Sequence, residues 1–499
     1  MAPPDATHAD AMLTEPSSAA PPHEISPRAT LPYVARDSKF NLDAKIYGQY
    51  FQLYFNRLKI LAPRLEDAVQ AKWPNLPRAK VLDLKEGEEC VLSGTLYKDM
   101  KLKPCILDEY VKEAGVSASA VAIEDSKKTK FVGEDDSIVL EDEGARVKLT
   151  GAAIDVNALV TGVVLAARGR VVPGGEFEAD EICFPRPAAA RRSAAPADAS
   201  TAAAADLKGK RVVLVSDLRV GDPASSNPLN LELMLDFLTG NLGGAADASE
   251  AASVARVVVC GGALSKAEVP ASSLDPREKA QISRPLRELD VLLSQLCSSV
   301  HVDVMPGEGD PTNQALPQQP LHPCLFPSAA RYDTFAASTN PHEFDVGGVG
   351  FLGTSGQNIS DLCKYTNVRK GGGGEVEGEG EGGDAAAAEE RLDLMESSLR
   401  WQHLAPSAPD TLACYPYKDR DPFHLDACPD VYFAGCQPAF GSRVVELERR
   451  GAGAGAGGET TRTLAVSVPS FAATGTIVMV DLETLTCTPV TFGDGGAAR

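Results

Sequence analysis

The sequence predicts two folded parts, a small all-β barrel followed by a larger domain in which helices and strands form α/β/β layers. Two observations lead to this prediction. Residues 80–185 hold several short strand-like segments with glycine-bearing turns and little helix. From residue 210 onward, apolar strands alternate with helical stripes of leucine, and the last segments are strands alone. The fold class is therefore α/β plus all-β, with a second β layer that completes the α/β domain.

The N-terminal region divides into a polar tail and a helical segment. Residues 1–32 are rich in alanine, proline and serine, which predicts a disordered tail. The tail contains no basic stretch followed by an apolar block, so we expect no secretory signal. In the helical segment, residues 40–76, we expect Pro63 to break or kink the helix. Its apolar residues at helical spacing are Ile46, Tyr50, Leu53, Leu61 and Leu65.

Residues 80–185 predict a small barrel, of which the OB-fold is one type. The candidate strands are Cys90–Tyr97, Arg146–Gly151, Val160–Ala166 and Glu178–Phe184. OB-folds often bind single-stranded nucleic acid through a basic groove with exposed aromatic side chains. Three lysines, Lys98, Lys101 and Lys103, lie beside Tyr97 in the sequence. Acidic residues surround them, so we favour a solvated loop and keep a DNA contact as the alternative.

An alanine- and proline-rich linker, residues 186–209, precedes the α/β domain, residues 210–490. Two low-complexity segments inside this domain, 371–390 and 451–458, cannot bury apolar surface, and we expect mobile loops there. The helical stripes are Leu231–Leu238 and Leu286–Leu296. The predicted strands are Arg211–Val215, Val254–Cys260, Val300–Met305, Gly348–Gly353, Val431–Gly435, Thr463–Val468 and Thr476–Asp481.

Charge and cysteine content narrow the possible functions. The formal net charge of −21 opposes autonomous binding to a phosphate backbone and favours a basic protein partner. The eleven cysteines include no CxxC pair, so a zinc site of the usual spacing is not expected. Without a secretory signal we expect reduced thiols in the cytosol or nucleus. No apolar run approaches the roughly 20 residues of a membrane span.

In open α/β sheets, ligands bind where the strands end, so the segments after three strands are the candidate site. They are Ser216–Arg219, Gly261–Leu264 and Pro306–Asn313, and their order and spacing resemble calcineurin-like metallophosphoesterases. That family holds two metal ions with aspartate, asparagine and histidine at these points. Here Asp217 is kept, and Asp310 lies in the third segment. Substitutions stand at the other positions: Arg219 for a histidine, Gly262 for the bridging aspartate, Glu308 for the asparagine, and Cys436 where the final histidine pair is missing. We therefore expect no metal ion, no cofactor and no catalytic residue.

Longer ordered strings resemble the B-subunit family of replicative DNA polymerases, and within it the delta type. They are Ser93–Lys98, Val139–Glu143, Met305–Asn313, Leu316–Cys324, Phe351–Asn358 and Ala408–Pro416. The resemblance implies an OB-fold packed on an inactive phosphoesterase-like domain. It also implies a nuclear, non-catalytic scaffold of the polymerase delta complex that serves DNA replication and repair synthesis. Such a scaffold would bind the C-terminal cysteine-rich module of the catalytic subunit and a third, clamp-binding subunit, and would meet the sliding clamp and DNA only indirectly.

Large apolar side chains in the proline-rich turns 306–327 and 406–423 are the candidate interface anchors, because aromatic residues and methionine are favoured at such positions. They are Met305, Phe326, Tyr415, Tyr417 and Phe423. Simple packing of the loops is the alternative. If partner-facing apolar patches exist, the chain expressed alone should be poorly soluble or self-associate.

Three other functions stay open at this point. The chain could be a metal-dependent phosphoesterase or exonuclease, as are relatives that keep the full ligand set. It could be the small subunit of another replicative polymerase, since those of the alpha and epsilon types share the architecture. It could also be a single-strand binder that acts through the barrel.

Overall fold

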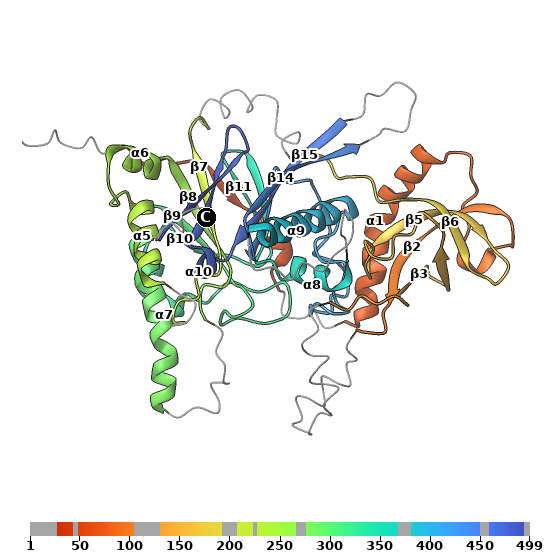
Figure 1. Ribbon diagram of the computed structural model, residues 1–499, viewed down its shortest axis with the longest axis horizontal. Helices are drawn as coiled ribbons and strands as arrows, with labels where there is room; N and C mark the ends of the chain where they lie inside the picture. The colour runs from red at the N-terminus through yellow and green to blue at the C-terminus, as the bar shows by residue number, and fades with distance from the viewer. Residues whose placement is uncertain are drawn as a thin grey trace, which may run out of the picture.

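The computed structural model describes residues 27–42, 48–103, 130–191, 207–222, 227–265, 276–367, 381–449 and 459–493. Within these ranges the strands form a closed five-stranded barrel and two six-stranded sheets. The barrel lies at one end of the molecule and the sheets fill the rest (Figure 1). None of the described helices combines the length and the apolar character that crossing a bilayer requires.

The barrel is built from β2 (Glu89–Asp99), β3 (Ser137–Glu141), β4 (Arg146–Thr150), β5 (Val164–Val171) and β6 (Phe177–Cys183). Its strands close in the order β2-β3-β4-β6-β5, with a parallel pairing of β4 and β6. Alternate side chains, such as Ile138 and Leu140 of β3, fill the interior. The predicted barrel is confirmed, and β3 is the strand that sequence periodicity missed.

Helix α1 (Tyr50–Lys72) packs along the barrel and runs through Pro63 without interruption. The expected break at Pro63 is therefore wrong. Pro63 lies on the exposed face, where water can solvate the carbonyl that its missing N–H leaves free. The opposite face buries Leu61, Leu65 and Val69 against the barrel, and this burial offsets the lost hydrogen bond.

The first sheet, in the order β10-β9-β8-β7-β16-β17, is parallel across β10 to β7 and antiparallel beyond. Its strands are β10 (Phe335–Ala337), β9 (His301–Met305), β8 (Val254–Cys260), β7 (Arg211–Val215), β16 (Thr476–Asp481) and β17 (Cys487–Thr491). The second sheet has the order β1-β11-β12-β13-β15-β14. Its strands are β1 (Tyr33–Ala35), β11 (His342–Val346), β12 (Val349–Thr354), β13 (Val431–Gln437), β15 (Glu459–Pro469) and β14 (Gly441–Arg449).

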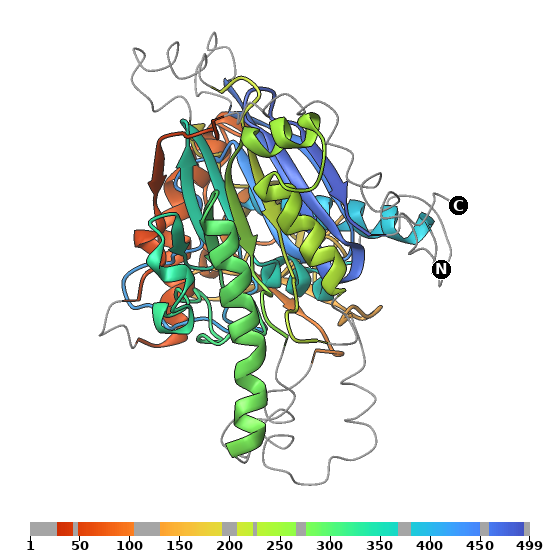
Figure 2. The same ribbon diagram turned by 90° about the vertical axis from the view of Figure 1, so that its left-hand side faces the viewer.

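The two sheets face each other across a shared apolar core that includes Val212 and Val258 of one and Phe351 and Val466 of the other. Helices α5 (Pro228–Thr239) and α7 (Pro276–Cys297) cover the outer face of the first sheet, as Figure 2 shows. Helices α8 (Gln357–Tyr365) and α9 (Glu381–Trp401) cover the outer face of the second sheet. The layers are therefore α/β/β/α rather than the expected α/β/β. Part of α7 projects beyond the body of the molecule in both views (Figures 1 and 2). A short helix, α6 (Ala245–Ser253), precedes β8.

Helix α9 also corrects the expected mobile loop over residues 371–390. The helix begins at Glu381, and Ala388 and Leu392 pack on the second sheet near Gly441. Alanine and glutamate are strong helix formers, so this end of the low-complexity run can extend a helix once an apolar face has a sheet to cover. Residues 368–380 and the predicted loop at 451–458 lie outside the described residues.

The predicted tail and linker are attached to the core at their described ends. Arg28 donates to the carbonyl oxygens of Leu238 (2.7 Å) and Ala251 (3.1 Å), so residues 27–32 are not a free tail. In the linker, the Arg191 guanidinium forms ion pairs with Glu343 (2.7 Å) and Asp345 (2.9 Å). Residues 1–26 and 192–206 lie outside the described residues.

A buried cluster of charges joins α1 to the α/β domain. The Arg57 side chain is fully buried and donates to Asp421 Oδ2 (2.8 Å) and to the carbonyl oxygens of Gly162, Pro406 and Ala408. On the far side, His403 Nε2 lies 2.9 Å from the same Asp421 oxygen. Burial and the nearby Arg57 lower the pKa of His403 to about 4, so its ring is neutral at physiological pH. Arg57 is therefore the one cationic partner of Asp421 within this cluster.

Candidate functional site

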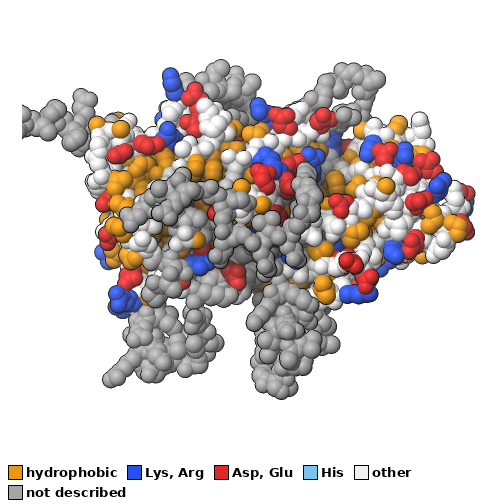
Figure 3. Space-filling model, in the orientation of Figure 1, with side chains coloured by type: hydrophobic (Ala, Val, Ile, Leu, Met, Phe, Trp, Pro, Cys, Tyr) orange, Lys and Arg blue, Asp and Glu red, His pale blue; other side chains and the backbone are white. Residues whose placement is uncertain are grey.

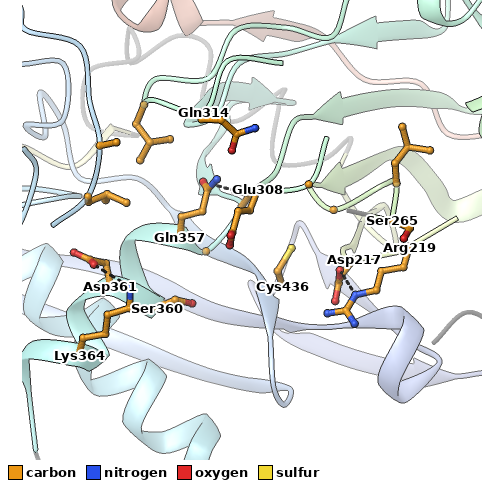
Figure 4. A pocket seen from close by; sticks show the side chains of 18 of the residues that line it. Asp217, Arg219, Ser265, Glu308, Gln314, Gln357, Ser360, Asp361, Lys364 and Cys436 are labelled. Carbon is orange, nitrogen blue, oxygen red and sulfur yellow. Dashed lines mark hydrogen bonds and ion pairs between the residues drawn. The ribbon is translucent and has the colours of Figure 1, made fainter. Parts of the chain in front are cut away.

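A pocket of about 810 Å³ opens where β7, β8, β9, β12 and β13 end. Figure 4 shows its side chains. Five of the six positions singled out in the sequence line it: Asp217, Arg219, Gly262, Glu308 and Cys436. The sixth, Asp310, is buried beside it. They meet because parallel strands bring their carboxyl ends to one edge of a sheet.

Asp217 has both carboxylate oxygens engaged by protein groups. Its Oδ1 accepts from Arg219 Nε (2.9 Å), and its Oδ2 accepts from the Ser470 hydroxyl (2.6 Å). Figure 4 shows the guanidinium of Arg219 turned toward this carboxylate. The two residues have φ angles of 56° and 46°, a strained backbone for side chains with a Cβ. The loop after β7 thus holds a cation of its own against the carboxylate.

Gly262 leaves no space for the aspartate that a bridging ligand would require. A Cβ built there would lie 2.9 Å from the Asp217 Cα, 2.9 Å from its Oδ1 and 3.2 Å from Cys436 Sγ. The φ of Gly262 is 67°, in the left-handed region that favours glycine. Backbone and neighbours together therefore exclude a larger side chain in this conformation.

The Asp310 carboxylate organises the loops instead of facing the pocket. It accepts backbone N–H groups from Gly262 (3.0 Å), Ala263 (3.3 Å), Leu264 (2.9 Å) and Gly307 (2.7 Å). Burial raises the pKa of Asp310, and the four N–H donors oppose that rise. Its role in this structure is to fix the turns after β8 and β9.

Cys436, the second-last residue of β13, has a φ of 52°, and its N–H donates to the Ser216 hydroxyl (2.8 Å). Burial, together with the carboxylates of Asp217 and Asp310, raises the pKa of its thiol well above the usual value. A neutral thiol is a poor nucleophile and a poor metal ligand.

These side chains do not fit a two-metal centre. Across the part of the chain that the structure describes, no group of three or more histidine, cysteine, aspartate or glutamate residues could hold a metal ion. Asp217 is already paired with a cation, and Asp310 accepts only backbone donors. Metal-assisted hydrolysis needs an open coordination site with several free ligands, which this arrangement does not provide.

The remaining pocket wall comes from α8 and from the loop 411–413, which the sequence analysis did not assign to a site. Asn340 connects this wall to the core, since its two Nδ2 hydrogens are shared among Gln318 Oε1 (2.8 Å), Ser355 Oγ (2.7 Å) and Gln357 Oε1 (2.7 Å). Ser355 lies in the glycine-rich turn between β12 and α8. Its hydroxyl accepts from Asn340 Nδ2 and donates to Gln357 Oε1. The sequence signal for this part of the wall was the string Phe351–Asn358, which the sequence analysis used only for the family resemblance.

Four of the five expected interface anchors are buried in the chain itself. Met305, Phe326, Tyr417 and Phe423 are fully buried, and Tyr415 is partly buried against the core that contains Tyr417 and Phe423. The anchor interpretation is wrong for the four, because Met305 ends the buried strand β9 and the loops that carry Phe326, Tyr417 and Phe423 fold back over the protein.

The barrel lysines do not form a basic groove. Lys98 is fully buried and its Nζ donates to the carbonyl oxygen of Tyr365, so its assignment as a DNA contact is wrong. Lys103 pairs with Asp410 (2.6 Å), and the exposed Lys101 pairs with Asp135 (2.6 Å). On the barrel, at the right of Figure 3, basic and acidic side chains are interspersed.

Comparison with known proteins places the chain in a family. The B-subunit family of DNA polymerases alpha and epsilon matches residues 212–442, and the DNA polymerase delta subunit OB-fold domain matches residues 49–182. The DNA polymerase delta small subunit of Arabidopsis thaliana is 39% identical over 474 residues, which cover 94% of this chain and 97% of the relative. Those of Oryza sativa (92% and 97% covered) and Saccharomyces cerevisiae (88% of each) are 38% and 35% identical. This chain belongs to the family of DNA polymerase delta small subunits.

Proposed function

We propose that this chain is a non-catalytic accessory subunit of a DNA polymerase delta complex. The observation that carries the proposal is the pocket at the strand ends, where Arg219 neutralises Asp217 and Gly262 has no room for a carboxylate. Membership in the small-subunit family supports the same assignment.

The finer assignments follow from the same reasoning. The α/β domain, residues 210–490, is an inactive, calcineurin-like phosphoesterase sandwich, and residues 80–185 form the OB-fold. Support comes from the two face-to-face sheets and from the strand ends that bring five of the six positions to one pocket, with Asp310 buried beside it.

As a scaffold, the chain links the C-terminal cysteine-rich module of the catalytic subunit to a third, clamp-binding subunit. It meets the sliding clamp and DNA only through these partners, in the nucleus, during replication and repair synthesis. The net charge of −21 supports protein partners over direct contact with phosphates. The interspersed charges of the described barrel face support the same conclusion.

Two measurements test the proposal. Purified protein with Mn²⁺ should not hydrolyse bis(p-nitrophenyl) phosphate or degrade single-stranded DNA above the level of Asp217→Ala and Asp310→Ala variants. Turnover that either substitution abolishes would refute the non-catalytic assignment. Co-expression with a polymerase delta catalytic chain should give a stable complex, whereas alpha and epsilon catalytic chains serve as controls. Preferential binding to either control would assign the chain to another replicative polymerase.

A further inference from the structure

The first turns of α1 present aromatic side chains to solvent. The exposed fractions are 52% for Tyr50, 67% for Phe51 and 52% for Phe55. The opposite face of the same helix buries Leu53 and Leu61, so these rings do not belong to the core that holds the helix in place. Three neighbouring exposed rings on one helix face form an apolar patch of the kind that marks an interaction site.

This patch forms one wall of a hollow of about 500 Å³ between α1 and the barrel. The other wall is the end of β2, and the rings of Tyr54 and Tyr97 also line the hollow. We call this hollow the aromatic groove, defined by Tyr50, Phe51, Tyr54, Phe55, Leu58 and Tyr97. Its apolar floor and its position between a helix and a strand give it the form of a groove that accepts a helix or an extended segment.

Acidic residues line the rim of the aromatic groove. The lining includes four carboxylates, of Glu141, Asp142, Glu143 and Asp410, and one guanidinium, of Arg146. Arg146 forms an ion pair with Glu141 (3.1 Å), and Asp410 pairs with Lys103. Asp142 accepts three backbone N–H groups, whose hydrogen bonds outweigh partial burial and lower its pKa. Glu143 is 64% exposed and lies 3.6 Å from Lys80.

The sign of this charge distinguishes two possible occupants. Exposed aromatic rings on an OB-fold face suit stacking with the bases of single-stranded nucleic acid, but such sites guide the phosphates with a basic groove. Arg146, Lys103 and Lys80 pair with three of the four carboxylates, so the rim keeps a net charge of −1, which disfavours phosphates and favours lysine and arginine. A protein segment with apolar anchors and flanking basic residues satisfies both the floor and the rim.

We propose that the aromatic groove binds a basic, apolar-anchored segment of another subunit of the polymerase complex. The proposal rests on the proposed function, because the partner is taken from that complex. The aromatic rings become buried when the segment binds and act as anchors. The carboxylates fix the orientation of the segment and speed its association. We therefore assign the partner contact to the aromatic groove and not to the anchors that the sequence analysis expected.

The test uses complexes co-expressed with the polymerase delta catalytic and third subunits. The variant Phe51→Ser/Phe55→Ser should weaken assembly at least tenfold, measured as the dissociation constant of the purified complex. The matched control, Leu229→Ser, removes a side chain that is 55% exposed on α5, at the opposite end of the molecule (Figure 1), and should leave assembly unchanged. Thermal melting of each isolated variant should match that of the wild type, because the changed side chains lie at the surface.

A charge variant and an exchange measurement give independent readouts. Glu143→Lys should weaken assembly and reduce its dependence on salt concentration. Hydrogen–deuterium exchange of the wild-type complex should show protection over residues 50–58 and 95–97 relative to the isolated chain. Unchanged affinity of the double serine variant, or an unprotected groove in an intact complex, would overturn the inference and leave the proposed function standing.

The same variants distinguish the other occupants. If the wild-type chain self-associates and Phe51→Ser/Phe55→Ser abolishes this, a second copy fills the groove and the proposal fails. Binding of fluorescein-labelled oligo(dT) at low salt that the same variant removes would identify a nucleic-acid site and also overturn it. Failure of the wild-type chain to form any polymerase delta complex would refute the proposed function itself.

Discussion

Replacing Arg57 by methionine should remove the connection between α1 and the α/β domain. The guanidinium is buried and makes hydrogen bonds to Asp421 and to three backbone carbonyls, at distances from 2.6 to 3.1 Å. Methionine fills much of the same volume, but it donates no hydrogen bond and carries no charge. The surroundings of the guanidinium are also tightly packed, because a Cβ built at Gly162 would overlap both the Pro406 carbonyl oxygen and Arg57 Nη1.

The expected loss follows from what remains in the cavity. Asp421 is fully buried; burial alone would raise its pKa, but its contacts with His403 and Arg57 lower it. Removal of one partner of a buried ion pair costs about 3–5 kcal/mol, because the other charge stays uncompensated. Burial, the largest cause that lowers the pKa of His403, remains in the variant and opposes protonation of this ring as a substitute for Arg57. We therefore expect Arg57→Met to lower the free energy of unfolding by about 3–5 kcal/mol.

Urea unfolding followed by tryptophan fluorescence measures this loss. The two tryptophans report on both sides of the connection, because Trp73 ends α1 beside the barrel and Trp401 ends α9. The control, Arg36→Met, breaks the pair with Asp345, in which the arginine side chain is 49% exposed, and should cost below about 1 kcal/mol. If Arg57→Met costs no more than this control, the buried cluster does not hold the two parts together and the reasoning is refuted.

Three further outcomes are expected. Burial alone would lower the pKa of His342, but the carboxylates of Asp303, 3.6 Å from Nε2, and Asp37, 2.8 Å from Nδ1, raise it to about 9. Protonation of this ring therefore stabilises the fold fully below about pH 6.5, and roughly 3 kcal/mol of the free energy of unfolding should be lost as the pH rises through 9. The melting temperature of His342→Gln should lack this pH dependence. Gly262→Asp should lower the melting temperature because of the clash with Asp217, and added Mn²⁺ should not restore it; a rise with Mn²⁺ would show that a metal site re-forms. Lys98→Glu should destabilise the chain by placing a carboxylate against the Tyr365 carbonyl without changing affinity for single-stranded DNA, and a loss of such affinity would restore the lysine as a DNA contact.

Strands buried on both faces were the elements that the sequence located best. Arg211–Val215, Val254–Cys260 and Thr476–Asp481 appear in the structure with the same bounds. Continuous runs of β-branched residues are typical of such strands, and their ends coincide with glycine or polar residues. Edge strands such as β10 and β14 were missed, because a short or half-exposed strand carries no comparable apolar run.

The candidate pocket was predictable in its members but not in its interactions. Spacing after successive strands brought Asp217, Gly262 and Glu308 to one place, as the order of a parallel sheet requires. The ion pair of Arg219 with Asp217 and the four backbone donors to Asp310 depend on loop conformations with positive φ angles, which local sequence does not specify. Gly262 can be read as a missing ligand from sequence, but only the structure shows that the space for that ligand is gone.

The sequence by itself determined the family, the barrel, the buried strands and the members of the pocket at the strand ends. These features depend on residue identity and on the order of residues along the chain, so they can be recognised without knowledge of the fold. The tertiary structure decided which charged and aromatic side chains are inside and which are outside. Lys98 is covered by Tyr365 and Arg57 by Asp421, residues hundreds of positions away, whereas Phe51 and Phe55 stay exposed because no described segment covers them. Burial is set by contacts between distant parts of the chain, and no local pattern contains that information.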